Sequence, residues 1–221
     1  MSINLENYQK INSIIAPYHA QLVAVSKTKP VEDILSLMQE GQIAFGENYV
    51  QELTEKHEAI PENIEWHFIG HLQSNKVKYI HEFVHLIHGI DSLKLLNEVN
   101  KQAEKSGRTS DCLLQIFIAD EATKFGLDEK EATEILELKE KGQLNNIRIR
   151  GLMGMASFTE DQQQIKNEFS GLKKLFDQFK QQPYFDTLSM GMSGDYQIAL
   201  DCGSTMIRIG SALFGARNYN K

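Results

Sequence analysis

The chain has 221 residues, of which 41% are hydrophobic and 24% are charged, and its formal net charge is −7. This length, without a Pro-, Ser- or Gly-rich linker, predicts one domain over 1–221, and the negative charge disfavours a nucleic-acid partner, which needs a basic face. Cys112 and Cys202 form no CxxC pair, and no apolar run approaches the roughly 20 residues of a membrane span, so we expect a cytoplasmic protein without membrane contact.

Apolar runs typical of strands alternate with helical patterns along the chain. The first expected element is a helix over about 3–18. The expected strands cover 22–26, 43–46, 65–70, 83–90, 112–118, 147–154, 187–191 and 206–210. Between the strands, apolar residues recur at the helical spacing i, i+3, i+4 and i+7, as in 31–41 and 167–180.

Eight apolar strands separated by helices predict an α/β fold, with a parallel sheet covered by helices. Eight strands close a (β/α)8 TIM barrel, and the chain length fits a slightly small barrel with an extra N-terminal helix. A doubly wound open sheet is the structural alternative. The G-x-G-x-x-G fingerprint that such a sheet might carry after its first strand is missing here.

In a TIM barrel the functional residues lie at the carboxyl ends of the strands, and two of these ends suit a phosphate. Ser193-Gly194 open a short helix expected over 193–200, and Gly210-Ser211 follow the last strand. Amides at a helix start, together with a serine hydroxyl, bind phosphate groups well. We therefore expect a ligand that carries a phosphate at one end.

Lys27 follows the first strand and is expected on the same face of the barrel. Burial disfavours the ammonium form of a lysine, and the neutral amine forms a Schiff base with an aldehyde. A phosphorylated aldehyde with a lysine partner points to pyridoxal 5'-phosphate (PLP). Arg208, inside the last strand, could then reach the pyridine nitrogen, and its permanent charge would keep that nitrogen unprotonated.

Six segments resemble one family closely. These segments are AVSKTKP, FGENYVQE, WHFIGHLQSNK, GLMGM, LSMGMSGDYQIAL and GSTMIRIGSALFGAR, and they run from Leu22 to about Arg217. In them the sequence resembles the PLP-binding homeostasis proteins of the bacterial YggS and eukaryotic PROSC type. The fold of that family is a barrel similar to the N-terminal domain of bacterial alanine racemases.

The resemblance implies a detailed cofactor site. It implies that Lys27 holds PLP as an internal aldimine and that Arg208 faces the pyridine nitrogen. The other implied contacts are Ser193, Gly210 and Ser211 at the phosphate, and Asn48 and Met155 beside the ring. His67 lies in a family motif and joins the cofactor-binding candidates without a defined role. Two positions depart from the family pattern, with His71 where Pro is frequent and Ser211 where Thr is frequent.

The resemblance also implies a function, namely carrying PLP and contributing to vitamin B6 and amino-acid homeostasis. We expect a monomer that makes transient contact with PLP-dependent enzymes. A PLP-dependent racemase or lyase acting on small amino acids is the alternative. In alanine racemases the second base is a tyrosine from a second domain, whereas this chain ends about ten residues after its last predicted strand. We therefore expect no catalytic residues.

Three further features carry competing hypotheses. The segment 81–85 matches the H-E-x-x-H zinc motif, which needs both histidines on one helix face, and a strand predicted from Phe83 would separate them. We therefore expect no metal site. Lys29 directly precedes a proline and is expected outside the pocket. Lys124 is either a solvated loop lysine or an auxiliary site that holds the aldehyde during transfer.

Overall fold

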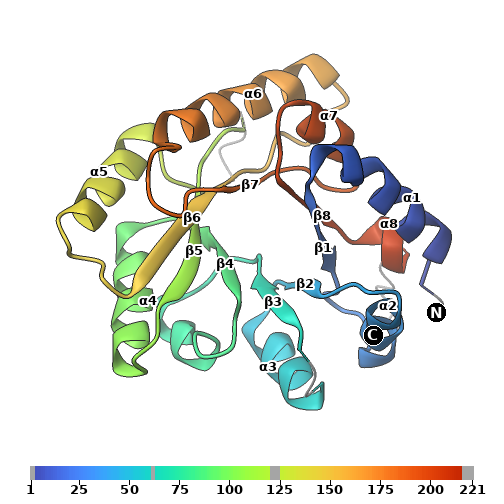
Figure 1. The fold of residues 1–221 in the computed structure, drawn as a ribbon, viewed down its shortest axis with the longest axis horizontal. Coiled ribbons are helices and arrows are strands. Elements are labelled where there is room, and N and C mark those ends of the chain that lie inside the picture. The colour runs from blue at the N-terminus through green and yellow to red at the C-terminus, as the bar shows by residue number, and fades with distance from the viewer. Residues whose placement is uncertain (1–2, 61–62, 120–124, 216–221) are drawn as a thin grey trace.

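A computed structural model of the chain describes residues 3–60, 63–119 and 125–215 (Figure 1). Its eight strands form a closed barrel in chain order, and every pair of neighbours is parallel, including β8 with β1. The strands are β1 (Gln21–Val25), β2 (Ala44–Glu47), β3 (Glu65–Phe68), β4 (Leu86–Ile90), β5 (Ser110–Gln115), β6 (Ile147–Met153), β7 (Thr187–Ser189) and β8 (Met206–Ile209). The predicted (β/α)8 barrel is thereby confirmed.

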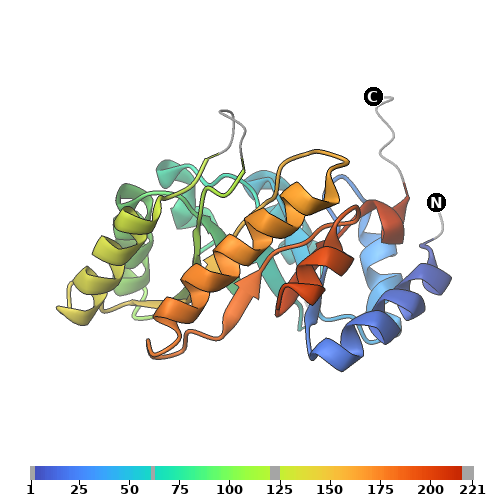
Figure 2. The ribbon, with the colours of Figure 1, turned by 90° about the horizontal axis from the view of Figure 1, so that it is seen from above.

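Helices surround the barrel, as the two views in Figures 1 and 2 show. The α-helices are α1 (Leu5–Ile15), α2 (Val31–Gln39), α3 (Val50–Ala59), α4 (Leu93–Lys105), α5 (Glu129–Glu140), α6 (Gln162–Phe179), α7 (Tyr196–Asp201) and α8 (Ser211–Phe214). Two 3-10 helices are η1 (Ala16–Tyr18) and η2 (Ser74–Tyr79), and η2 stands between β3 and β4 in place of an α-helix. Across the described ranges, no helix combines the length and the apolar content that crossing a membrane requires.

The strand side chains alternate between two apolar regions, one under the helices and one inside the barrel. Phe45, Trp66 and Phe68 belong to the large outer core and are fully buried; burying side chains of this size stabilises the fold by roughly 2 kcal/mol or more each. A separate, smaller cluster contains Val23, Ala44, Leu86, Leu113, Met153 and Met206. Paired residues of parallel neighbours point to the same face, so the pairs Val23–Arg208 and His67–Leu86 place Arg208 and His67 in the barrel interior.

The extra helix expected before the first strand is α1, extended by η1. The Asn4 side chain caps α1 by accepting the amide of Asn7 at 2.9 Å. The backbone N–H of Asn4 donates to the carbonyl of Leu213 at 2.8 Å, and the Asn7 side chain donates to the carbonyl of Ala212 at 3.0 Å. Both bonds attach α1 to α8, so the first helix packs on the segment that follows the last strand (Figure 1).

The strand predicted over 83–90 begins only at Leu86. The amides of Phe83 and Val84 both donate to the carbonyl of Ile80, which holds this part of the chain in a turn. The pairing between β3 and β4 therefore begins at His67 with Leu86. Phe83 and Val84 are apolar because they pack against the outer core, not because they belong to a strand.

Candidate functional site

A pocket of about 450 Å³ opens at the carboxyl ends of the barrel strands. Seven of the eight predicted site residues line it, namely Lys27, Asn48, Met155, Ser193, Arg208, Gly210 and Ser211. They come from β8 itself and from the segments that follow β1, β2, β6, β7 and β8. The rule that strand ends carry the site therefore identifies most of this pocket from the sequence.

Lys27 enters the pocket from a tight turn after β1. Ser26 is fully buried, Lys27 is half-buried, and Thr28 has a left-handed backbone with φ of 62°. A threonine is unfavourable in this region of backbone space and is held there by surrounding contacts. The amide of Thr28 donates to Oε1 of Glu52 at 2.5 Å, so a side chain of α3 holds the turn that carries Lys27.

A buried charged cluster lies beneath this turn, and we call Ser26, Glu47, Glu52 and Lys56 the Lys56 cluster. The Lys56 ammonium donates to Glu47 and Glu52, each at 2.7 Å, and to the carbonyl of Ser26 at 2.8 Å. The Ser26 hydroxyl donates to Oε1 of Glu47 at 2.6 Å. Burial raises the pKa of Glu47, and the positive charge of Lys56 opposes that rise. This cluster was not predicted. The sequence does place Glu47 directly after an expected strand, and Glu52 and Lys56 have the spacing of neighbours on one helix face.

Lys29 lines the same pocket, so its predicted position outside the pocket is wrong. Its ammonium donates to the carbonyl of Phe214 at 2.7 Å and to that of Gly215 at 3.3 Å. The proline that follows Lys29 does not turn it away, because the positive φ of Thr28 redirects the chain first. Lys29 therefore attaches the first loop of the barrel to the last.

The two predicted phosphate segments meet in the same pocket. The Ser211 hydroxyl donates to Oγ of Ser193 at 3.3 Å, joining the segments after β7 and β8. Gly191 makes the turn that delivers Ser193, because its φ is 97° and a Cβ there would lie 2.6 Å from the Cβ of Ala199. A Cβ built on Gly194 would meet nothing within 4 Å, so the backbone borders open space.

The helix expected from Ser193 begins three residues later, at Tyr196. The amides of Asp195 and Tyr196 both donate to the carbonyl of Met192, and Oδ1 of Asp195 accepts the amide of Met192 at 2.5 Å. These bonds close a turn over 193–195 before the helix begins. The serine and glycine therefore line the pocket from a turn, and the first helical residue is Tyr196.

Arg208 and Asn48 supply buried polar groups to the pocket. The Arg208 guanidinium is buried and donates to Oγ of Ser189 at 2.6 Å and to the carbonyl of Gly154 at 3.2 Å. Burial lowers the pKa of Arg208 to about 10, so the group stays cationic at neutral pH. Oδ1 of Asn48 is buried and has no hydrogen-bond partner among the described residues, which leaves it available to a ligand.

His67 does not line the pocket and lies behind Arg208 instead. It is the first member of a hydrogen-bonded series that we call the interior polar chain, made of His67, His88, Ser189 and Arg208. Nδ1 of His67 lies 2.9 Å from Nε2 of His88, and Nδ1 of His88 lies 3.1 Å from Oγ of Ser189. Burial and then the nearby His85 lower the pKa of His67 to about 3, and burial lowers the pKa of His88 well below its usual value. Both imidazoles are therefore neutral at pH 7.

Other candidates from the sequence are not among the described residues that line the pocket. No helix spans 81–85 in the described structure, so the H-E-x-x-H residues do not share a helix face. His71 is exposed, and its Nδ1 lies 3.0 Å from Oδ2 of Asp91. Lys124 lies outside the described residues.

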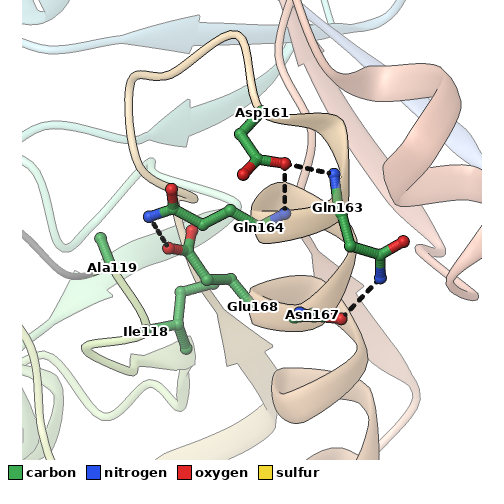
Figure 3. Close-up of a pocket in the computed structure, with 7 residues that line it drawn as sticks. All are labelled: Ile118, Ala119, Asp161, Gln163, Gln164, Asn167 and Glu168. Atoms are coloured by element: carbon green, nitrogen blue, oxygen red, sulfur yellow. Dashed lines mark hydrogen bonds between the residues drawn. The ribbon is translucent and has the colours of Figure 1, made fainter.

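A wider hollow of about 540 Å³ lies at the start of α6, beside Ile118 and Ala119 (Figure 3). Oδ1 of Asp161 accepts the amides of Gln163 and Gln164, and these two glutamines bond Asn167 and Glu168 in turn. The polar groups of the hollow thus form hydrogen bonds with one another and cap the start of α6. None of the predicted site residues lines this hollow.

Comparisons with known proteins identify the family of this chain. A family model described as "Alanine racemase, N-terminal domain" matches residues 5–218. A protein of Vibrio alginolyticus named "Pyridoxal phosphate homeostasis protein" is 46% identical over 210 residues, covering 92% of this chain and 89% of its own length.

Solved structures share the barrel. PipY of Synechococcus elongatus, with PLP bound, matches with a TM-score of 0.86 at 33% identity, covering 95% of this chain and 99% of PipY. The alanine racemase of Bartonella henselae, with covalently bound pyridoxal phosphate, matches with a TM-score of 0.75 at 16% identity. It covers 100% of this chain and 62% of the racemase, a likeness of fold alone. Because the family model and the Vibrio relative both match nearly the whole chain, the protein belongs to the pyridoxal phosphate homeostasis family, built on the barrel of the alanine racemase N-terminal domain.

Proposed function

We propose that this protein binds PLP in the pocket at the strand ends and carries it as part of PLP homeostasis. The observation that carries the proposal is that Lys27, Arg208 and the Ser193–Ser211 pair line one pocket. When bound, PLP supplies an aldehyde that a lysine amine holds covalently and a ring that stabilises negative charge on an amino acid. The relatives' name and the PLP in PipY support the same function.

The residues present fit this cofactor. The open space beside Gly194 and the two serine hydroxyls suit a phosphate, and Lys27 suits the aldehyde. The unpartnered Oδ1 of Asn48 is a buried acceptor that a ring substituent can satisfy. Arg208 is cationic and only donates hydrogen bonds, so it would hold a ring nitrogen in the unprotonated form.

We infer that the protein carries the cofactor without turning over amino acids. Apart from Lys27 and Arg208, the ionisable side chains in the described lining are Lys29 and Asp195. Lys29 bonds two backbone carbonyls, and Asp195 accepts the amide of Met192. Because both side chains are engaged in these hydrogen bonds, neither is placed to act as a second base that abstracts a proton. An arginine at the ring nitrogen also weakens the cofactor as an electron sink. Delivery of PLP to enzymes that depend on it would follow from such a carrier role.

The test is to load the protein with PLP, reduce it with borohydride and map the labelled peptide. We expect label on Lys27, and we expect Lys27→Ala to lose the visible absorbance of the bound cofactor. Lys29→Ala is the matched control, since Lys29 lines the same pocket, and it should keep that absorbance. Label on any other lysine would contradict the role of Lys27.

A second measurement separates carrier from enzyme. The PLP-loaded protein is incubated with L- and D-amino acids in deuterated water, followed by chiral analysis and mass spectrometry. We expect neither turnover nor exchange of the α-proton above a PLP-only control. Turnover that disappears in Lys27→Ala would instead establish a racemase or lyase.

A further inference from the structure

Three potential metal ligands meet at the mouth of the barrel opposite to the pocket. Glu65 is the first residue of β3, His85 directly precedes β4, and His67 lies in the interior between them and the pocket. One ligand atom from each of these residues lies within 4.8 Å of the ligand atoms of the other two. The sequence predicted no metal site, because His67 and His85 are 18 positions apart and only the register of β3 and β4 brings them together.

His67 carries an independent sign of an unfilled site. It is fully buried, and its Nδ1 is already in contact with His88. Its Nε2 is buried without a hydrogen-bond partner among the described residues. A buried unsatisfied nitrogen is costly and calls for an explanation, and a bound ion is one.

The other two ligands have the freedom and the support that a metal site requires. His85 is exposed and Glu65 is half-buried, so both side chains can move inward. Ligands of a tetrahedral zinc ion at 2.0–2.1 Å lie about 3.4 Å apart, so separations of up to 4.8 Å must shorten by at most about 1.4 Å. Gln21 donates to Oε2 of Glu65 at 3.1 Å, and this bond orients the carboxylate while leaving its other oxygen for an ion.

We propose that Glu65, His67 and His85 bind one divalent transition-metal ion of the zinc type at the amino-terminal mouth of the barrel. Two imidazole nitrogens and one carboxylate oxygen form a donor set that zinc accepts, with a fourth position left open. A hollow of about 240 Å³ opens beside His85, which lines it together with His81 and Asp111. Arg108 and Arg148 line the same hollow; Arg148 pairs with Asp111 at 2.7 Å, and Arg108 donates to the carbonyl of Glu82.

Metal binding at Nε2 of His67 has a consequence for the interior polar chain. A neutral imidazole with metal on Nε2 carries its proton on Nδ1 and therefore donates to Nε2 of His88. His88 then carries its proton on Nδ1 and donates to Oγ of Ser189, which also accepts from Arg208. One arrangement of protons thus satisfies the chain from the metal to the pocket.

The test uses the full-length protein without a histidine tag, freed of metal by chelation and titrated with Zn²⁺ and with Co²⁺. Calorimetry should give one saturable Zn²⁺ site, and Co²⁺ should develop the visible bands of a tetrahedral N/O site. His85→Ala and Glu65→Gln should each weaken Zn²⁺ binding by at least about tenfold. His81→Ala is the matched control, because His81 lines the same hollow and belongs to the H-E-x-x-H match, and it should leave the affinity unchanged.

Each outcome of these titrations either supports or overturns the proposal. One-to-one binding that depends on His85 and Glu65 supports the proposal. Absence of saturable binding, or unchanged binding in both variants, overturns it. Equal loss in His81→Ala also overturns it, since the ion would then sit among other residues. His85 and Glu65 are chosen over the fully buried His67, whose replacement could disturb folding.

Discussion

At the scale of single residues, Ser193 and Ser211 bring the two predicted phosphate-binding segments together. Their hydroxyls lie 3.3 Å apart although they are 18 positions apart in the sequence. If both contact the cofactor phosphate, Ser193→Ala should weaken PLP binding by about tenfold or more, because a hydrogen bond to a charged group contributes roughly 1.5–3 kcal/mol. Fluorescence titration with PLP measures the loss.

Pyridoxal, which lacks the phosphate, is the matched ligand for this prediction. Its affinity should be the same in the wild type and in Ser193→Ala. Equal weakening of PLP and pyridoxal would contradict a phosphate contact, because it would show that the serine supports the pocket as a whole.

Glu47 gives a prediction about pH. Burial raises its pKa in the folded state above the usual value of 4.5, so the folded protein keeps this proton to higher pH than the unfolded chain does. Its contribution to stability is therefore fully present below about pH 4.5 and is lost as the pH rises through the folded pKa. The free energy of unfolding of Glu47→Gln, measured relative to wild type in urea, should increase as the pH is raised from 4.5 to 7. Glu6→Gln, an exposed acid on α1, controls for the loss of one carboxylate, and a difference that does not change with pH would contradict the assignment.

At the scale of elements, α3 holds the turn after β1. Lys56 is 6% exposed and bonds Glu47, Glu52 and the carbonyl of Ser26. Lys56→Met removes these bonds and leaves the Glu47 carboxylate buried beside fewer donors. We expect a loss of about 3 kcal/mol in the free energy of unfolding, as for other broken buried ion pairs, together with weaker PLP binding because the turn carrying Lys27 loosens.

The double variant Lys56→Met with Glu47→Gln checks the cause. It removes the uncompensated charge, so it should recover part of the stability lost by Lys56→Met alone. Additive losses in the two single variants would show that the ion pair does not couple α3 to β2.

The element pattern was largely predictable because a barrel strand is buried on both faces and stands out as a short apolar run. The failures came where apolar or turn-forming residues serve another purpose. Phe83 and Val84 are apolar but bond Ile80 in a turn. Ser193 was expected to start a helix, and the side chain of Asp195 closes a turn there first. Lys29 was expected outside the pocket, and it lines the pocket directly after the left-handed Thr28.

At the scale of the whole molecule, the barrel brings distant residues to one axis. Lys27, Ser193 and Ser211 were found from the sequence because the strand-end rule needs only the order of elements. The interior polar chain was not found, because it depends on closure and register. His67, His88, Ser189 and Arg208 come from β3, β4, β7 and β8, and no local pattern links them. His67 was expected to contact the cofactor. It does not line the pocket and instead contacts His88, which contacts Ser189.

Ser189 is the link between the two histidines and Arg208, so it tests whether this chain supports the fold and the pocket together. Ser189→Ala leaves a nitrogen of Arg208 and Nδ1 of His88 without their present partner in a fully buried site. We expect the free energy of unfolding to fall by about 2 kcal/mol, with weaker PLP binding because Arg208 loses one of its two hydrogen-bond acceptors.

Ser13→Ala, an exposed serine that bonds only within α1, is the control. Stability within about 0.5 kcal/mol of wild type would contradict a structural role. A stability loss with unchanged PLP affinity would separate the two roles, because Gly154 would then suffice to hold Arg208 against the cofactor.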